Sequence, residues 1–167
     1  MALFKKRQKA EPKPAPVPVA QTTTYDFIAK CIDEKSEKAL VKYQKFWTDP
    51  EDKYEGMKLM EFKAEGVPGD KIYQYPPLDV DVKLDAFIGV GDDDSVSINV
   101  FVLDGDNELF VGPAAKTKAK KILRILQENK PKISGELYGG KYWKMEDSGY
   151  VNADWSDPLT VRVYLKY

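Results

Sequence analysis

The strongest constraint on the fold is a stretch in which apolar residues occupy every second position. Val96, Ile98, Val100 and Val102 follow this pattern, which is the period of a β-strand with one buried face. Similar short segments lie at residues 58–66, 80–88 and 108–111, divided by Gly, Pro and Asp clusters that favour turns. We therefore expect an antiparallel sheet, with a tight hairpin at residues 104–105.

Two amphipathic segments are expected to form helices. Residues 113–130 carry an apolar stripe with lysines on the opposite side, and Pro113 and Pro131 mark the two ends. Residues 33–47 form the second helix, which stops at Pro50. Residues 25–32 fit both the helical and the strand period, and we favour a helix there.

The C-terminal part indicates more strands. Residues 132–138 and 141–145 are expected to pair through a two-residue hairpin at Gly139-Gly140, because glycine tolerates the positive φ angles of such turns. Residues 159–167 alternate again, and this last strand should hold the C-terminus in the sheet. The predicted class is α+β: a mainly antiparallel curved sheet or partial barrel packed with an amphipathic helix, plus an N-terminal helix.

The N-terminal arm, residues 1–21, differs from the rest of the chain. Prolines stand at every second position from Pro12 to Pro18, which favours an extended polyproline II conformation. The arm holds five basic residues and one acidic residue, a net charge of +4, and the remaining residues carry −5. We interpret it as a basic tether, followed by a helical extension at 22–56 and an α+β domain at 57–167.

Composition excludes several kinds of chemistry. The chain has no histidine and one cysteine, Cys31, which excludes Ser-His-Asp and Cys-His catalysis and the usual zinc sites. The acidic run from Asp104 resembles a calcium loop but has Leu109 where the loop needs glycine and Ala115 where it needs glutamate. We expect a protein that is not an enzyme and needs no metal or cofactor, although carboxylate chemistry without a motif stays open.

The same features indicate where the chain resides. No apolar run reaches the roughly 18 residues that a membrane helix needs. The basic N-terminus is followed by prolines and lysines where a secretory signal needs apolar residues. The lone Cys31 cannot form an internal disulfide. We therefore expect a cytoplasmic protein without a transmembrane segment.

Aromatic residues beside lysines are the main candidates for a binding site. Tyr73, Tyr75, Tyr138, Tyr142 and Trp143 lie near Lys71 and Lys141, in segments expected to be loops or strand ends. Such residues can stack bases and neutralise phosphates. The alternative is that they fill a small core with their polar tips at the surface.

Three local sequences point to a family resemblance. They are Met-Glu-Phe-Lys-Ala-Glu-Gly-Val at residues 60–67, Val-Ser-Ile-Asn-Val at 96–100, and Asp-Gly at 104–105 followed by Leu-Phe-Val-Gly-Pro at 109–113. In this order, over about residues 57–140, the chain resembles a HIRAN domain, a small β-barrel-like module related in shape to OB folds. The Asn-Pro-x-Asp sequence of that family is absent, and Gly-Asp-Asp-Asp-Ser stands in its place at 91–95.

The resemblance implies a nucleic-acid-binding accessory module that recognises single-stranded DNA, with Asp94 standing in for the missing acid. Together with the aromatic and lysine residues, the candidate nucleic-acid-binding set is Lys71, Tyr73, Tyr75, Asp94, Tyr138, Lys141, Tyr142 and Trp143. The alternative function is a protein-interaction or structural domain that uses an exposed sheet edge or the helix at 33–47. The expected partner is accordingly single-stranded DNA or another protein, and the sequence predicts no oligomeric state.

Overall fold

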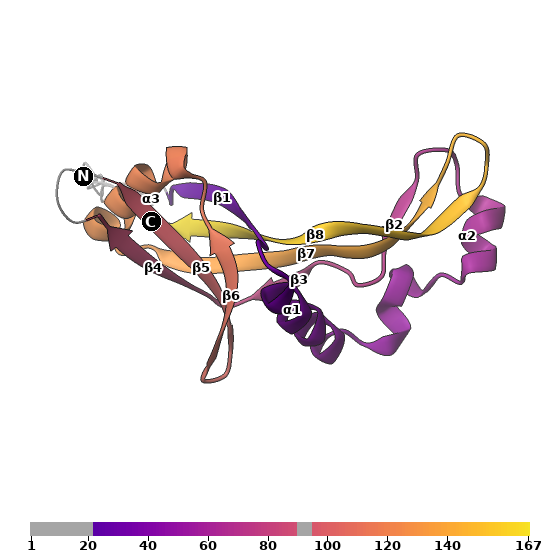
Figure 1. Ribbon diagram of the computed structural model, residues 1–167, viewed down its shortest axis with the longest axis horizontal. Helices are drawn as coiled ribbons and strands as arrows, with labels where there is room; N and C mark the ends of the chain where they lie inside the picture. Colours follow the sequence, from indigo (N-terminus) through magenta and orange to yellow (C-terminus); the bar gives the residue numbers. More distant parts are fainter. Residues whose placement is uncertain (1–21, 90–94) are drawn as a thin grey trace, which may run out of the picture.

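The computed structural model describes residues 22–89 and 95–167 and has two antiparallel sheets with helices packed around them (Figure 1). The predicted α+β class is therefore confirmed. In chain order the elements are β1 (Thr24–Lys30), α1 (Glu34–Trp47), the 3-10 helix η1 (Pro50–Gly56), α2 (Leu59–Glu65), β2 (Lys71–Tyr73), β3 (Leu78–Val80), β4 (Val82–Ile88), β5 (Val96–Asp104), β6 (Asn107–Pro113), α3 (Lys116–Asn129), β7 (Lys132–Met145) and β8 (Val151–Lys166).

A long β7–β8 hairpin runs through the molecule, with α3 near one end and α2 at the other (Figure 1). The larger sheet has the order β1-β8-β7-β2, and β3 pairs with β7 beside β2. The smaller sheet has the order β4-β5-β6. The chain passes from one sheet to the other at Asp81, so the segment 80–88, expected as one strand, belongs to two. Within the described ranges neither sheet closes into a barrel.

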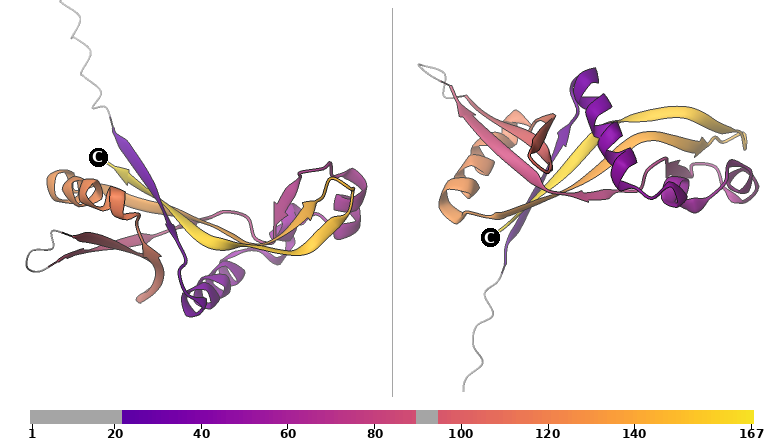
Figure 2. Two further views of the ribbon diagram at one scale, coloured as in Figure 1. Left: turned by 45° about the horizontal axis from the view of Figure 1, so that its top comes forward. Right: turned by 90° about the horizontal axis from the view of Figure 1, so that it is seen from below.

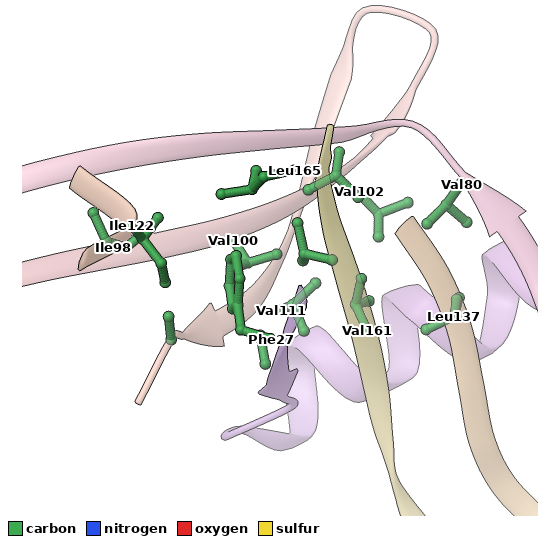
Figure 3. Packing of buried hydrophobic residues seen from close by; sticks show 14 of the residues in the cluster. Phe27, Val80, Ile98, Val100, Val102, Val111, Ile122, Leu137, Val161 and Leu165 are labelled. Carbon is green, nitrogen blue, oxygen red and sulfur yellow. The ribbon is translucent and has the colours of Figure 1, made fainter. Parts of the chain in front are cut away.

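The main core lies where the two sheets and α3 meet (Figure 3). The smaller sheet contributes the alternating residues of β5, and Ile98, Val100 and Val102 are all fully buried. The larger sheet contributes Val161 and Leu165 of β8, which are also fully buried. Each such aliphatic side chain contributes about 1.5–3 kcal/mol when it leaves water. The alternating apolar residues of β5 therefore form the centre of the core.

β1 is a strand where we expected a helix, so that prediction was wrong. It pairs with β8 from Thr24 opposite Lys166 to Lys30 opposite Thr160. Phe27 and Ala29 point into the core and are buried. The local sequence allowed both periods, and the pairing with β8 decided between them. Residues of the expected N-terminal extension thus belong to the same sheet as the C-terminal strand.

The segment at 58–66 is the second correction, because it forms α2 and not a strand. Leu, Met, Glu, Lys and Ala are good helix formers, and the Glu61 carboxylate accepts a hydrogen bond of 2.8 Å from the Lys58 backbone N–H at the helix start. Phe62 is the buried residue of this helix. The opening strand of the HIRAN resemblance is therefore helical in this chain.

The third correction concerns Gly139 and Gly140, which form no hairpin. β7 continues through them as one strand with a register shift, at positive φ angles of 105° and 86°. A Cβ at Gly139 would lie 2.7 Å from the Pro158 carbonyl oxygen. The hairpin turn lies instead between β7 and β8, where the Glu146 N–H donates to the Tyr150 carbonyl at 2.9 Å.

Other expectations are confirmed. α1 begins after Asp33, whose carboxylate accepts a 2.8 Å hydrogen bond from the Ser36 N–H. α3 ends at Asn129 as expected, and its buried residues are Ala119, Ile122 and Ile125. Its start is later than the expected Pro113: the helix begins at Lys116, because Pro113 is the last residue of β6. The expected tight hairpin joins β5 and β6, with Gly105 and Asp106 as the two residues between the paired Asp104 and Asn107. No helix among the described residues is long and apolar enough to cross a membrane.

Candidate functional site

Beyond the main core, β2 and the far end of the β7–β8 hairpin form a three-stranded extension with two different faces. On one face a small distal cluster buries side chains under α2. Trp143 lies on this face and stacks against Tyr54, with ring centroids 3.7 Å apart and planes 7° from parallel. The buried members of the distal cluster are Phe62, Ile72, Met145 and Val151.

The opposite face gathers aromatic rings and lysines, and we call it the aromatic–lysine face. It consists of Lys71, Tyr73, Tyr142, Lys144 and Trp155. Strand register brings these residues together: Lys71 lies opposite Lys144, and Tyr73 lies opposite Tyr142 on β7. Tyr142 in turn lies opposite Trp155 on β8. Since directly paired residues share a face of an antiparallel sheet, the five side chains form a continuous row across three strands.

The three rings of this face are in contact. Tyr142 and Trp155 are nearly parallel, at 15°, with centroids 6.4 Å apart. Tyr73 meets Tyr142 edge to face at 5.5 Å. The inner ring, Tyr142, is only 6% exposed, whereas Trp155 is 45% exposed. Trp155 therefore offers its ring to solvent while Tyr142 supports it from within the sheet.

Two ammonium groups lie over these rings. The Lys71 Nζ lies 3.7 Å from the centroid of Tyr142 and 4.6 Å from that of Tyr73. The Lys144 Nζ lies 5.7 Å from the centroid of Trp155. Cation–π attraction of this kind is worth about 0.5–1 kcal/mol at exposed sites. Lys144 is thus held beside the exposed indole, and Lys71 is held beside the two tyrosine rings.

Carboxylates balance both lysines. Asp157 forms an ion pair with Lys71 and accepts a 2.6 Å hydrogen bond from the Tyr73 hydroxyl. Partial burial would raise the pKa of Asp157, but the hydrogen bonds from Lys71 and Tyr73 outweigh it and hold that pKa below its usual value. Lys144 pairs with Glu146 at 3.2 Å. The face therefore has ordered charges of both signs and no large excess of either.

The structure brings together only part of the candidate set. Lys71, Tyr73 and Tyr142 share the aromatic–lysine face. Trp143 and Lys141 alternate with Tyr142 along β7 and so belong to the opposite side, where Trp143 packs in the distal cluster. Lys141 is exposed, and within the described ranges it forms no ion pair.

The remaining candidates lie elsewhere. Tyr75 is buried, and the Lys53 Nζ lies 6.0 Å from its ring centroid. Tyr138 lies farther along β7, with the Arg162 guanidinium 5.9 Å from its ring. Neither belongs to the aromatic–lysine face. Asp94 lies outside the described residues.

Sequence reasoning missed Trp155, the most exposed ring of the face, together with Lys144 and Asp157. Trp155 stands just before Ser156, Asp157 and Pro158, residues typical of a turn. One signal could have identified Trp155. The apolar residues of the last strand, Val161, Val163 and Leu165, stand at every second position, and Trp155 continues this series on the other side of Pro158.

No cluster of potential metal ligands accompanies this face. Among residues 22–89 and 95–167, no three His, Cys, Asp or Glu side chains lie together as a metal site would require. Comparison with family models, curated proteins and solved structures finds no match for this chain.

Proposed function

We propose that this chain is a non-enzymatic module that binds single-stranded nucleic acid through the aromatic–lysine face. The observation that carries the proposal is the half-exposed Trp155 ring, which stacks on Tyr142, with Lys144 beside it and Lys71 over Tyr142. Single-strand binding proteins use aromatic rings to stack bases and nearby cations to contact the backbone. A reducing cytoplasm, which suits the lone thiol of Cys31, is part of the proposal.

Stacking should supply most of the affinity. Lys71 and Lys144 already pair with Asp157 and Glu146. Their contact with a phosphate group should therefore add little binding free energy. Base stacking on an aromatic side chain is worth about 1–3 kcal/mol. With two lysines on this face, Lys71 and Lys144, the slope of log K against log salt should be no steeper than about −1.4, at about −0.7 per phosphate.

The proposal stands on this geometry and does not depend on the resemblance to HIRAN domains. That resemblance implies the same class of ligand, but its expected opening strand is α2, and Asp94 is outside the described residues. The acid beside the lysines is Asp157. The HIRAN resemblance and the aromatic–lysine face therefore imply the same class of ligand through different residues.

The test is fluorescence anisotropy with labelled single-stranded and duplex oligonucleotides over a salt series, using the full chain. Trp155→Ala should weaken single-strand binding about 5- to 150-fold. Phe87→Ala removes a comparably exposed ring, at 55%, from the smaller sheet and should leave binding unchanged.

A neutral-arm variant, with Lys5, Lys6, Arg7 and Lys9 replaced by Gln, separates the face from the arm. Retention of single-strand binding in this variant supports the proposal. The proposal would be refuted if single-strand binding were lost in the neutral-arm variant but unchanged by Trp155→Ala. Absence of any single-strand binding by the full chain would do the same.

The second candidate is a protein-interaction domain, and one observation favours it. Phe46 and Trp47, at the end of α1, are 76% and 55% exposed and contact each other edge to face. Exposed aromatic residues that lie together are typical of protein contacts. Two results together would favour this second function. The chain would show no affinity for nucleic acid, and Phe46→Ala would abolish binding to a protein partner.

A further inference from the structure

A groove along the first residues of β7 has a volume of about 660 Å³, and none of its lining residues belongs to the aromatic–lysine face. The C-terminal end of α1, strand β3, the β5–β6 turn and the first residues of β7 line it. Its aromatic wall consists of Tyr43 and Trp47 of α1, whose ring centroids are 6.2 Å apart, and Tyr164 of β8 also lines the groove. Trp47 is more than half exposed and stands over this groove without a covering element among the described residues.

The groove is polarised in charge. At the α1 end it is lined by Asp79, Asp81 and Asp104, and none of these carboxylates forms an ion pair within residues 22–89 and 95–167. At the other end it is lined by Lys132 and Lys166. No described cation therefore forms an ion pair with the carboxylates of the acidic end.

The electrostatic effect of these acids reaches the aromatic wall. Partial burial, followed by the nearby charges of Asp104 and Asp81, raises the pKa of the Tyr43 phenol. Both carboxylates therefore act on the same ring, and the negative potential is concentrated at the aromatic end of the groove.

The chain supplies a segment whose chemistry fits this groove. Residues 1–21 carry basic residues at Lys5, Lys6, Arg7 and Lys9, followed by prolines at every second position from 12 to 18. Proline-rich segments in the polyproline II conformation dock in grooves lined by aromatic side chains, at low entropic cost. Unpaired carboxylates beside the aromatic wall would attract the basic cluster.

The arm also starts in the right place. Thr23 and Tyr167 exchange backbone hydrogen bonds of 2.7 and 2.9 Å, and Thr24 pairs with Lys166, which lines the groove. Figure 2 shows β1 beginning beside the C-terminus. The arm therefore begins at the lysine end of the groove, and its own basic residues, farthest from this anchor, can reach the acidic end.

The length of the groove agrees with the length of the proline segment in the arm. Along β7 the groove extends from Lys132 to the level of Leu137, the partner of Leu78, a span of about 17 Å at 3.3 Å per residue. The prolines from 12 to 18 span about 19 Å at 3.1 Å per residue. Residues 19–22 remain to reverse the direction of the chain, because Thr23 is held by Tyr167. A tethered segment also has an effective concentration in the millimolar range, so weak contacts suffice.

From these observations we propose that the N-terminal arm folds back onto its own molecule and docks in this groove, with its prolines against the aromatic wall and its basic cluster beside Asp79, Asp81 and Asp104. The proposal concerns a different surface from the aromatic–lysine face and stands whether or not that face binds nucleic acid.

The test is paramagnetic relaxation enhancement in the full chain. Cys31→Ser removes the native thiol, and Ala10→Cys carries a nitroxide label beside the basic cluster. Backbone amides at residues 79–81 and 103–105 should lose peak intensity, while amides at 153–156 on the aromatic–lysine face should not. The same labelled protein bearing the four Gln substitutions of the neutral-arm variant should show the intensity restored.

Three results would overturn the proposal. One is the absence of intensity loss at the groove; another is an equal loss in the neutral-arm background. The third is a loss that appears only when ¹⁵N-labelled protein without nitroxide is mixed with unlabelled protein that carries it, because the arm of a second copy would then be the occupant. Salt gives an independent check: at 1 M, where the Debye length is about 3 Å, the intensity loss should decrease.

Discussion

Replacement of Phe62 by Ala should unfold α2 while leaving the main core intact. Phe62 is the buried residue of α2 and the largest member of the distal cluster, at 2% exposed. It is absent from the main core cluster. A buried Phe→Ala change costs about 3–5 kcal/mol when the site cannot collapse around the gap.

The free energy that holds α2 in place is too small to compensate for this loss. The four buried side chains of the distal cluster contribute about 6–12 kcal/mol in total, and ordering the seven residues of α2 costs about 7–14 kcal/mol. These quantities are of similar size, so α2 is held by a small margin. Loss of the Phe62 ring should exceed that margin.

Hydrogen exchange read by mass spectrometry gives the test. In Phe62→Ala, amides of residues 59–65 should exchange at the rate of an unfolded segment, while those of β5 and α3 keep their protection. Leu137→Ala is the matched control, because Leu137 is fully buried in the main core and its loss should lower global stability by about 2–5 kcal/mol. Equal acceleration in α2, β5 and α3 by Phe62→Ala would refute the argument, since the two clusters would then unfold as one.

Three further changes have defined outcomes. Asp33→Ala removes the N-cap acceptor of Ser36 and should lower the free energy of unfolding in urea by about 0.5–2 kcal/mol, with Asp33→Asn retaining most of it. Gly139→Ala places a side chain at a φ of 105° against a backbone carbonyl and should cost at least about 1–2 kcal/mol by the same measurement. The lowered pKa of Asp157 means that its pairing with Lys71 stabilises the fold above the unfolded pKa of about 3.9 and is lost as the pH falls through the folded value. Because the pair is partly exposed, wild type and Asp157→Asn should differ by about 0–1 kcal/mol at pH 7 and converge in acid.

The parts of the fold that could be predicted are those where local sequence and packing agree. β5 and α3 have unambiguous periods, and both pack directly on the main core. The local sequence could not decide β1, because it pairs with residues of β8 that are 130 to 142 positions away. The prediction for the α2 segment was wrong for a different reason. Phe62 is its one buried residue, so the segment lacks the regular apolar pattern that identifies a helix or a strand.

The candidate site was predicted in composition and only partly in geometry. Tyr73 and Tyr142 do meet, but which neighbours of Tyr142 share its face depends on register shifts after Tyr138 and after Tyr142. Such bulges change which residues face the same side of a sheet, and they depend on pairing with β8. The partner strand was expected to begin only at residue 159, so Trp155 had no strand on which to be placed.

The two proposed surfaces differ in the way their charges are arranged, and this difference bears on both proposals. On the aromatic–lysine face each lysine has a carboxylate partner, so the rings must supply selectivity and the charges mainly hold them in place. In the groove, Asp79, Asp81 and Asp104 have no such partner within the described ranges. Unpaired acids repel phosphates and attract cations, so a basic arm docked there is kept away from a nucleic acid bound at the other end of the hairpin. Neutralising the three acids should therefore release the arm and make nucleic-acid binding by the full chain more dependent on salt.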